Sequence, residues 1–240
     1  MRGSRRLRGF LCLLPTALML AGCGSSTVFQ DEFESDTVGQ RPILSPPGNP
    51  ADDLIYLSDA SNPVPGQFTV VDHDDLGKSL RYANNAEPVY LRYIGFMSMP
   101  VSGGSDQLWA SWSAVPNLPD DASPLDIWVG DGHFGKSVGI RLDNGRVYVQ
   151  TAGGSSPAYE EIGTYVNGNV HSFVINLNGE DGTCGVLFSQ MGAPGATPPR
   201  RPLLANNALT ASRPTLYMWF SAEGTSGGTY TVDEVMLRRE

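Results

Sequence analysis

The stretch SVGIRLDNGRVYVQT, residues 137–151, decides the fold class. Asn144 and Gly145 lie at its centre, and tight primed turns favour this dipeptide because both residues accept positive φ. On either side apolar residues alternate with polar or small ones, so each half places its apolar side chains on one face of a strand. These apolar residues are Val138, Ile140, Leu142, Val147 and Val149. A hairpin with one apolar face and one polar face is typical of an antiparallel sheet.

The same pattern recurs along most of the chain. With the two halves of the hairpin included, about eleven short alternating runs bounded by turn residues are candidate strands. No stretch after the first 22 residues shows helical periodicity for three turns. So many strands must cover their apolar faces with another sheet, which predicts an all-β, antiparallel two-sheet β-sandwich over residues 29–240. A closed barrel is the structural alternative.

The first 22 residues have the features of a targeting segment. Four arginines precede an apolar run from Phe10 to Leu20, which is too short to span a membrane as a permanent helix. The following Leu20-Ala21-Gly22-Cys23 resembles the cleavage box of bacterial lipoproteins. This resemblance implies removal of residues 1–22, acylation of Cys23 with chains such as palmitate, and a short tether over residues 23–28.

Gly24 follows the predicted lipidated cysteine, where an Asp would imply retention in the inner membrane. The resemblance therefore implies a lipid-anchored envelope protein, in the outer membrane if the cell has two membranes. Two or more acyl chains anchor a protein stably, whereas one chain does so only marginally.

The charge of the chain argues against a nucleic-acid partner. Loss of the four arginines in residues 1–22 takes the net charge from −9 to −13, and an acidic surface repels phosphate backbones.

Of the three cysteines, Cys12 leaves with the signal and Cys23 is lipidated, so no internal disulfide forms. The remaining Cys184 is expected to be a buried small residue, because free cysteine is usually buried.

Four acids fall within residues 31–36, in the sequence DEFESD. They suggest a catalytic carboxylate pair, a metal site or the solvated side of a strand. Laminarinase-type enzymes carry their acids as E-x-D-x-x-E, and that string occurs nowhere in this chain. In a strand Glu32, Glu34 and Asp36 would share one face, so these residues alone leave acid–base chemistry open.

Two other segments resemble functional motifs, a nucleophile elbow and a calcium loop, but the residues around them do not fit either one. Residues 135–139 fit G-x-S-x-G, but the nucleophile elbow needs a strand before the serine and a helix after it. Here a glycine-rich loop precedes Ser137 and a strand follows. Residues 72–83 begin like a calcium loop, but Ala83 stands where a bidentate glutamate is required.

Three segments in order, DEFESDTVGQRP, FTVVDHDDLGKSLRY and the terminal YTVDEVML, resemble jelly-roll sandwiches of the concanavalin A-like lectin/glucanase superfamily, including laminin G-like domains. Both ends are also similar to carbohydrate-binding modules of families 4 and 22. In those modules the first and last strands are neighbours and often hold a structural calcium, which implies that DEFES, residues 31–35, is the first strand here. The resemblance implies Glu34 and Asp233 as calcium ligands, with loop carbonyls completing the shell; a solvated acidic strand without metal is the alternative.

Sugar binding usually requires exposed aromatic rings, whose flat apolar faces cover the C–H faces of pyranoses. Alternation places Trp109 opposite Trp112 on its strand, so Trp112 is expected in the core and Trp109 outside. By the same argument Tyr217 and Trp219 point away from their apolar neighbours. Trp109, Tyr217 and Trp219 are the predicted binding platform, although core packing is the commoner role of an aromatic residue.

The sequence thus favours an envelope lipoprotein whose sandwich binds carbohydrate or another envelope ligand without catalysis. A polysaccharide hydrolase or lyase on the same fold is one alternative. A structural envelope or appendage component that makes protein contacts is the other.

Overall fold

A computed structural model describes residues 26–44, 55–57, 65–85, 93–98, 106–131, 135–154, 156–190, 198–205, 207–221 and 227–240. The predicted signal peptide and Cys23 lie outside these residues. In the part of the chain described, no helix is long and apolar enough to cross a membrane.

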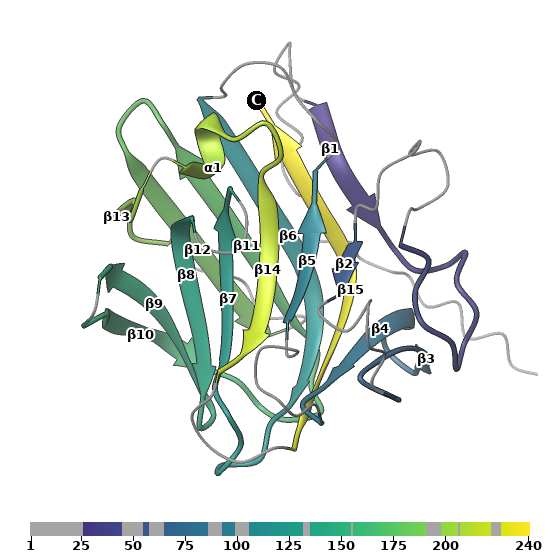
Figure 1. The fold of residues 1–240 in the computed structure, drawn as a ribbon. Coiled ribbons are helices and arrows are strands. Elements are labelled where there is room, and N and C mark those ends of the chain that lie inside the picture. Colours follow the sequence, from purple (N-terminus) through teal and green to yellow (C-terminus); the bar gives the residue numbers. More distant parts are fainter. Residues whose placement is uncertain are drawn as a thin grey trace, which may run out of the picture.

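The described strands form two antiparallel sheets, and in Figure 1 sheet B lies in front of sheet A. Sheet A has the order β13-β12-β11-β6-β15-β4-β3, with β1 also paired to β15. Its strands are β1 (Ser26–Asp31), β3 (Phe68–His73), β4 (Gly77–Ala83), β6 (Gln107–Asn117), β11 (His171–Asn178), β12 (Thr183–Gln190), β13 (Arg201–Pro202) and β15 (Thr229–Arg239). Sheet B has the order β10-β9-β8-β7-β14-β5-β2. Its strands are β2 (Ile55–Leu57), β5 (Tyr93–Met97), β7 (Leu125–Gly130), β8 (Lys136–Asp143), β9 (Arg146–Ala152), β10 (Ala158–Thr164) and β14 (Thr215–Phe220).

The predicted hairpin is confirmed in β8 and β9. Asn144 and Gly145 have φ values of 49° and 77°, as a primed turn requires. Leu142 pairs with Val147 and Ile140 pairs with Val149, and none of these side chains is more than 1% exposed. The apolar faces of the two sheets enclose one core, so the sandwich prediction is confirmed and the barrel alternative is wrong.

Aromatic residues fill much of the space between the sheets. Trp112 of β6 stacks on Phe173 of β11 with ring centroids 4.9 Å apart. The Nε1 of Trp112 donates a hydrogen bond to the hydroxyl of Tyr230 at 2.9 Å, so this buried polar pair is satisfied. Cys184 is also in the core at 2% exposure, as predicted.

The first strand differs from its prediction. β1 ends at Asp31, and the chain then turns through Phe33, whose φ is 51°. The turn is closed by the Asp36 N–H, which donates to the Phe33 carbonyl at 3.0 Å. The left-handed conformation places the Phe33 ring in the core at 0% exposure. DEFES is therefore the end of a strand followed by a turn, and the strand begins at Ser26, before the predicted boundary at residue 29.

The predicted pairing of the first and last strands is confirmed. β1 runs antiparallel to β15, with Asp31 opposite Val235 and Ser26 opposite Arg239. The first half of β15 pairs instead with β4, from Thr229 opposite Ala83 to Val232 opposite Leu80. One edge of β15 thus changes neighbour between residues 232 and 235, and this change positions the acidic residues.

Candidate functional site

Six carboxylates gather where β15 changes its neighbour. We call this group the acidic seam: Asp31, Glu32, Glu34, Asp36, Asp233 and Glu234. A bulge interrupts the β6–β15 ladder between Asp233 and Met236, and Glu234 at this bulge has a φ of 52°. Bulges often re-aim a side chain at the point where pairing changes. The sequence pattern indicates the acids, but it does not indicate the bulge.

Two carboxyl groups of the seam are nearly enclosed by protein. Asp31 is 7% exposed, and its burial raises its pKa to about 6 although its Oδ1 accepts a hydrogen bond from the Phe33 N–H at 2.8 Å. Asp233 is 5% exposed, and burial raises its pKa to about 7, with further contributions from the charges of Glu234, Glu32 and Glu34. Within the described residues, the buried Oδ1 of Asp233 has no hydrogen-bond partner. Such a buried, unpaired acceptor favours the protonated carboxyl or a bound cation.

The predicted calcium ligands Glu34 and Asp233 both lie at the seam and are close enough for the charge of Glu34 to act on Asp233. Lys78 is the neighbouring cation, but its Nζ donates to the backbone carbonyls of Glu34 at 2.7 Å and Asp36 at 3.1 Å. Carboxylate and carbonyl oxygens are the hard donors that calcium prefers. Among the described residues, however, no group of three or more His, Cys, Asp or Glu side chains is arranged to hold a metal ion.

The predicted aromatic platform is wrong in one member. Tyr217 and Trp219 lie on β14, where Leu216, Met218 and Phe220 face the core, so both aromatics point outward from sheet B. Trp109 also points outward, opposite core residues of β6, but β6 belongs to sheet A. The thickness of the sandwich therefore separates Trp109 from the other two. Alternation assigns a side chain to one face of its own strand, but it does not say which sheet that strand joins.

The outer face of sheet B instead carries an ordered set of side chains. Residues paired in successive strands form a transverse row across six strands: Glu161, Tyr148, Arg141, Asp126, Trp219 and Tyr93. Because the strands are about 4.8 Å apart, five steps give a row roughly 24 Å long. This row and its neighbour, which includes Trp128 and Tyr217, form the candidate binding face.

Aromatic rings are packed together on this face. Trp128 and Tyr217 stack with centroids 5.4 Å apart, and Trp219 meets Trp128 edge-on at 6.0 Å. Tyr93 lies 6.3 Å from Tyr217. Gly95 makes this packing possible, because a Cβ at that position would lie 2.6 Å from Cε1 of Tyr217. Trp128 is completely buried under its neighbours, while Trp219 and Tyr93 keep partly exposed surfaces for a ligand.

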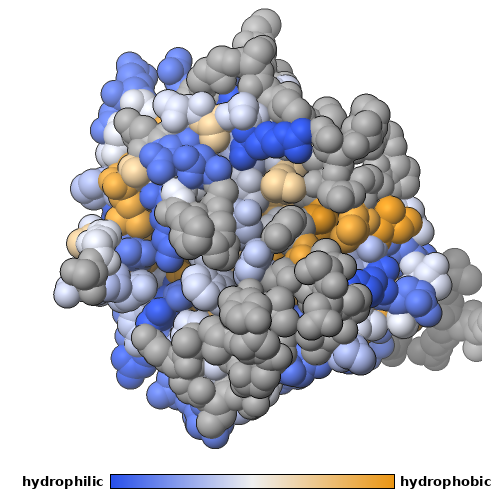
Figure 2. Space-filling view, in the orientation of Figure 1, coloured by the Kyte–Doolittle hydropathy of each residue, from blue (hydrophilic) through white to orange (hydrophobic). Residues whose placement is uncertain are grey.

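Charged groups flank the aromatic rings. Arg141 donates two hydrogen bonds to Asp126, at 2.8 and 2.9 Å, and its guanidinium lies 4.9 Å from the centre of the Tyr159 ring. The Nζ of Lys136 lies 4.5 Å from the centre of the Trp128 ring. Burial lowers the pKa of Lys136, and the nearby Asp126 carboxylate partly opposes that shift. Figure 2 views this side of the molecule and shows one hydrophobic patch on the left and a larger one that extends from near the centre to the right.

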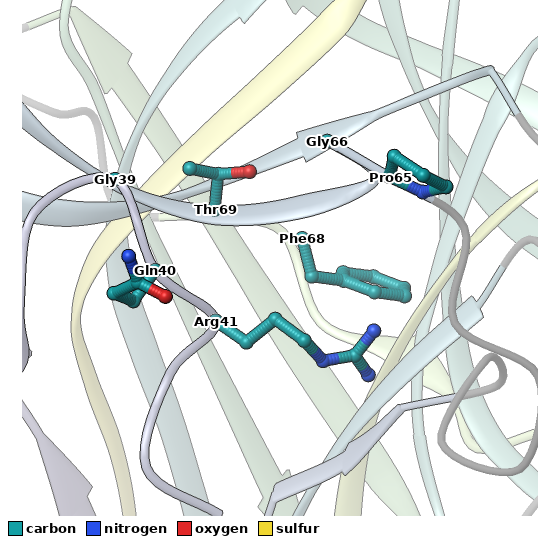
Figure 3. Close-up of a pocket in the computed structure, with 7 residues that line it drawn as sticks. All are labelled: Gly39, Gln40, Arg41, Pro65, Gly66, Phe68 and Thr69. Carbon is teal, nitrogen blue, oxygen red and sulfur yellow. The ribbon is translucent and has the colours of Figure 1, made fainter.

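A separate hollow of about 170 Å³ lies at the edge of sheet A. Gly39, Gln40, Arg41, Pro65, Gly66, Phe68 and Thr69 line it (Figure 3). The loop through Gly39 and Gln40 is hydrogen-bonded to the edge strand β3 at Val70, with distances of 2.8 Å. Phe68 stacks on Tyr82 of the core, so the hollow has one aromatic wall. It is remote from the transverse row, because β3 and the row belong to different sheets.

Ser137, the serine of the rejected G-x-S-x-G motif, has a structural role. Ser137 lies within β8 and has no exposed surface. Its Oγ accepts a hydrogen bond from the backbone N–H of Ala208 at 2.8 Å, in the short helix α1 (Asn207–Thr210). A buried serine at this position in a strand is not a nucleophile elbow.

No protein-family model matches this sequence, and no curated protein matches it either. Solved structures do match. The catalytic domain of the glycoside hydrolase family 131 protein from Coprinopsis cinerea superposes with a TM-score of 0.57 at 11% identity, covering 88% of this chain and 93% of that one. Peanut lectin, solved with a nine-residue peptide, superposes with a TM-score of 0.56 at 12% identity, covering 90% and 97%. The binding domain of botulinum neurotoxin serotype G gives a TM-score of 0.51 at 8% identity, covering 88% and 47%.

The chain spans about half of the neurotoxin binding domain and 15% of a sialidase, which matches with a TM-score of 0.46 at 13% identity over 67% of this chain. The structural neighbours are concanavalin A-like jelly-roll proteins. At these identities the likeness shows the fold alone. The jelly-roll prediction is confirmed, and the fold is compatible with carbohydrate binding.

The acidic seam predicts an unusual pH dependence of stability. In the folded chain Asp31 and Asp233 release protons near pH 6 and 7, whereas an unfolded aspartate does so near its ordinary pKa of 3.8. The folded state therefore binds more protons between about pH 4 and 7, and its free energy of unfolding should fall as pH rises through this window, by up to about 7 kcal/mol for the two groups together. Urea titrations in a chelator at several pH values measure this slope.

Asp233→Asn should flatten the slope and raise stability at pH 8. Asp74→Asn, in the exposed turn between β3 and β4, is the matched control and should leave the slope unchanged. An Asp233→Asn variant with the slope of the unmodified protein would contradict the buried-acid explanation.

Proposed function

We propose that this chain is a lipid-anchored protein of the cell envelope whose sandwich binds carbohydrate, without catalysis, on the outer face of sheet B. The observation that carries the proposal is the transverse row, in which partly exposed aromatic rings lie beside a fixed ion pair. Trp219 is directly opposite both Tyr93 and Asp126 in the neighbouring strands. Apolar ring faces and fixed polar groups on one surface are the two elements that sugar recognition requires.

The polar part of the row suits hydroxyl groups. The Asp126 and Arg141 side chains are 15% and 18% exposed, so their hydrogen-bonding atoms are held by each other and by the sheet. A preformed pair of this kind loses little side-chain entropy when a ligand binds. The length of the row is more suitable for an oligosaccharide than for a single sugar.

The charge pairing on this face supports binding rather than hydrolysis. Glycoside hydrolysis uses two carboxylates that face one bond. On the described part of the face, Asp126 is engaged by Arg141, and Glu161 forms an ion pair with Arg146 at 2.8 Å. A glycoside hydrolase and a lectin are both among proteins with this fold, so release of sugar from a substrate is the test that separates the alternatives.

The envelope address rests on the N-terminal sequence. Leu20-Ala21-Gly22-Cys23 follows a basic and then an apolar segment, as in bacterial lipoproteins. Acyl chains on Cys23 would hold the sandwich at the membrane surface and leave its outer faces free for envelope ligands.

A structural calcium at the acidic seam is the second part of the proposal. Glu34 and Asp233 would be its ligands, with backbone carbonyls completing the coordination shell. The buried, unpartnered Oδ1 of Asp233 and the many surrounding carboxylates support a cation there. The ion would offset the repulsion between these charges and fix the turn after β1 against β15.

Trp219→Ala should weaken oligosaccharide binding at least tenfold, because it removes the partly exposed ring that lies between Asp126 and Tyr93 in the row. Binding is measured with the full-length protein in detergent, first on an oligosaccharide array and then by calorimetry with the best-retained oligosaccharide. Trp109→Ala is the matched control on sheet A and should bind as the unmodified protein does. Equal weakening by the two variants would refute the assignment to sheet B, and release of reducing sugar by the unmodified protein would favour the hydrolase alternative.

Cys23→Ser should move the protein from the membrane fraction to the soluble fraction of the producing bacterium, because the acyl chains can no longer be attached. Metabolic labelling with a fatty acid gives a second readout and should be lost as well. Cys184→Ser keeps the predicted lipidation site and should remain labelled and membrane-bound. Retention of label by Cys23→Ser would rule out the predicted anchor.

Millimolar calcium should raise the melting temperature of the protein by several degrees, since a ligand of the folded state alone stabilises it. Glu34→Gln should abolish this increase, and in a chelator it should melt no lower than the unmodified protein, because it also removes one repelling charge from the seam. The control is Glu180→Gln, in the exposed turn between β11 and β12, which should respond to calcium normally. A protein that melts at one temperature with and without calcium has no such site.

A further inference from the structure

We propose that the carbohydrate bound by sheet B is acidic, and that Lys136 binds an anionic group of this ligand. The inference rests on the proposed function and names its substrate class. The relevant anionic groups are the carboxylate of a uronic acid and a sulfate ester, which both offer oxygen acceptors with a negative charge.

The cations on the described part of this face differ in their pairing. Arg141 is neutralised by two hydrogen bonds to Asp126, and Arg146 is paired with Glu161 at 2.8 Å. Lys136 has neither an ion pair nor a hydrogen bond to any residue that the structure describes. One positive charge is therefore left over on this face of a chain with a net charge of −9.

The position of Lys136 holds its charge over the aromatic cluster. The pairing of β7 with β8 shifts register between Val129 and Gly130. As a result Lys136 pairs with Gly130, which is two residues after Trp128 in β7. The ammonium lies 4.5 Å from the centre of the Trp128 ring, where the ring quadrupole attracts a cation. The buried Trp128 thus serves as a support for Lys136 rather than as a surface for the sugar.

Partial burial leaves the ammonium short of acceptors. Lys136 is partly covered, and this loss of water is the main reason that its pKa is lowered. An ammonium group has three donors, and the ring face beneath it satisfies none of them fully. An oxyanion of the ligand would supply the acceptors and the opposite charge together.

The other lysine of the chain shows the contrast. Lys78 donates to two backbone carbonyls, at 2.7 and 3.1 Å, and lies beside the acidic seam. Its role is structural and local to sheet A. Lys136 has no comparable structural role. Asp126 is the acid whose charge acts on Lys136, and it is already paired with Arg141.

The test compares three oligosaccharides of equal length: an oligouronate, a sulfated neutral oligomer and the unsulfated neutral oligomer. Calorimetry with the full-length protein should give at least tenfold tighter binding to one of the two acidic ligands than to the neutral one. Higher salt should weaken the binding of the acidic ligand and leave the binding of the neutral oligomer unchanged. Comparison of oligouronate with sulfated oligomer identifies which anion the site accepts.

Lys136→Met should remove the preference for the acidic ligand and change neutral binding less than twofold. Lys136→Arg should retain much of the preference, and Lys78→Met removes the same charge from sheet A and should retain all of it. Circular dichroism establishes that each variant is folded.

The outcomes separate the two proposals. If the neutral oligomer binds as tightly as the acidic ones and Lys136→Met changes nothing, the acidic specificity is refuted while carbohydrate binding stands. If none of the three ligands binds and the oligosaccharide array is also negative, the proposed function itself has failed.

Discussion

The pairing of the last strand is the constraint on which the rest of the structure depends. β15 runs beside β6 along nearly its whole length, while its other edge pairs first with β4 and then with β1. Three separate parts of the chain therefore meet at one strand. The change from β4 to β1 requires a break in the ladder, and the positive φ of Glu234 provides it. Because the break falls within an acidic sequence, the geometry of the sheet concentrates negative charge at this point.

The seam is held against repulsion by contributions from the backbone and from apolar packing. Lys78 reaches the carbonyls of the turn, and the Oδ1 of Asp36 accepts a hydrogen bond from the Ile43 N–H at 2.6 Å. Phe33 is buried in the core, which fixes the turn in a conformation that a non-glycine residue rarely adopts. Burying one large aromatic side chain contributes roughly 2–3 kcal/mol, which outweighs the cost of about 1–2 kcal/mol for a left-handed residue.

Much of the fold could be predicted from the sequence, because period-two alternation is a local property. It correctly placed Trp112 in the core, Trp219 outside, and the turn at Asn144 and Gly145. None of the alternating runs that predicted strands falls on β10, whose residues are all exposed or half-buried because the strand lies at the edge of sheet B and has only β9 as a partner. An edge strand needs no regular apolar face, so its alternation is weak.

The candidate site was less predictable, since it depends on which strands become neighbours. Glu34 and Asp233 were brought to one seam as expected, because the order of the terminal strands follows from the jelly-roll resemblance. The assignment of Trp109 to the same platform as Trp219 was wrong, because the sheet that a central strand joins is a non-local property. Of the transverse row, alternation predicted Trp219 as an outward-facing aromatic, but nothing in the sequence indicated the row itself. Its members are up to 126 residues apart, from Tyr93 to Trp219, and only the register of five strand pairs aligns them.

Packed core residues connect the acidic seam to the candidate binding face. This packing limits how far a structural change at the seam can alter the aromatic rings of sheet B. The Phe33 ring lies 6.5 Å from Phe96 of β5, and the other face of β5 carries Tyr93 and Gly95 beneath the Tyr217 ring. A close-packed core transmits strain, but β5 is held by hydrogen bonds to β14 and β2 on its two sides. Proton or cation binding at the seam must displace this paired strand before it can alter the aromatic face. The seam should therefore act on the stability of the sandwich, while ligand affinity is set by the side chains of sheet B.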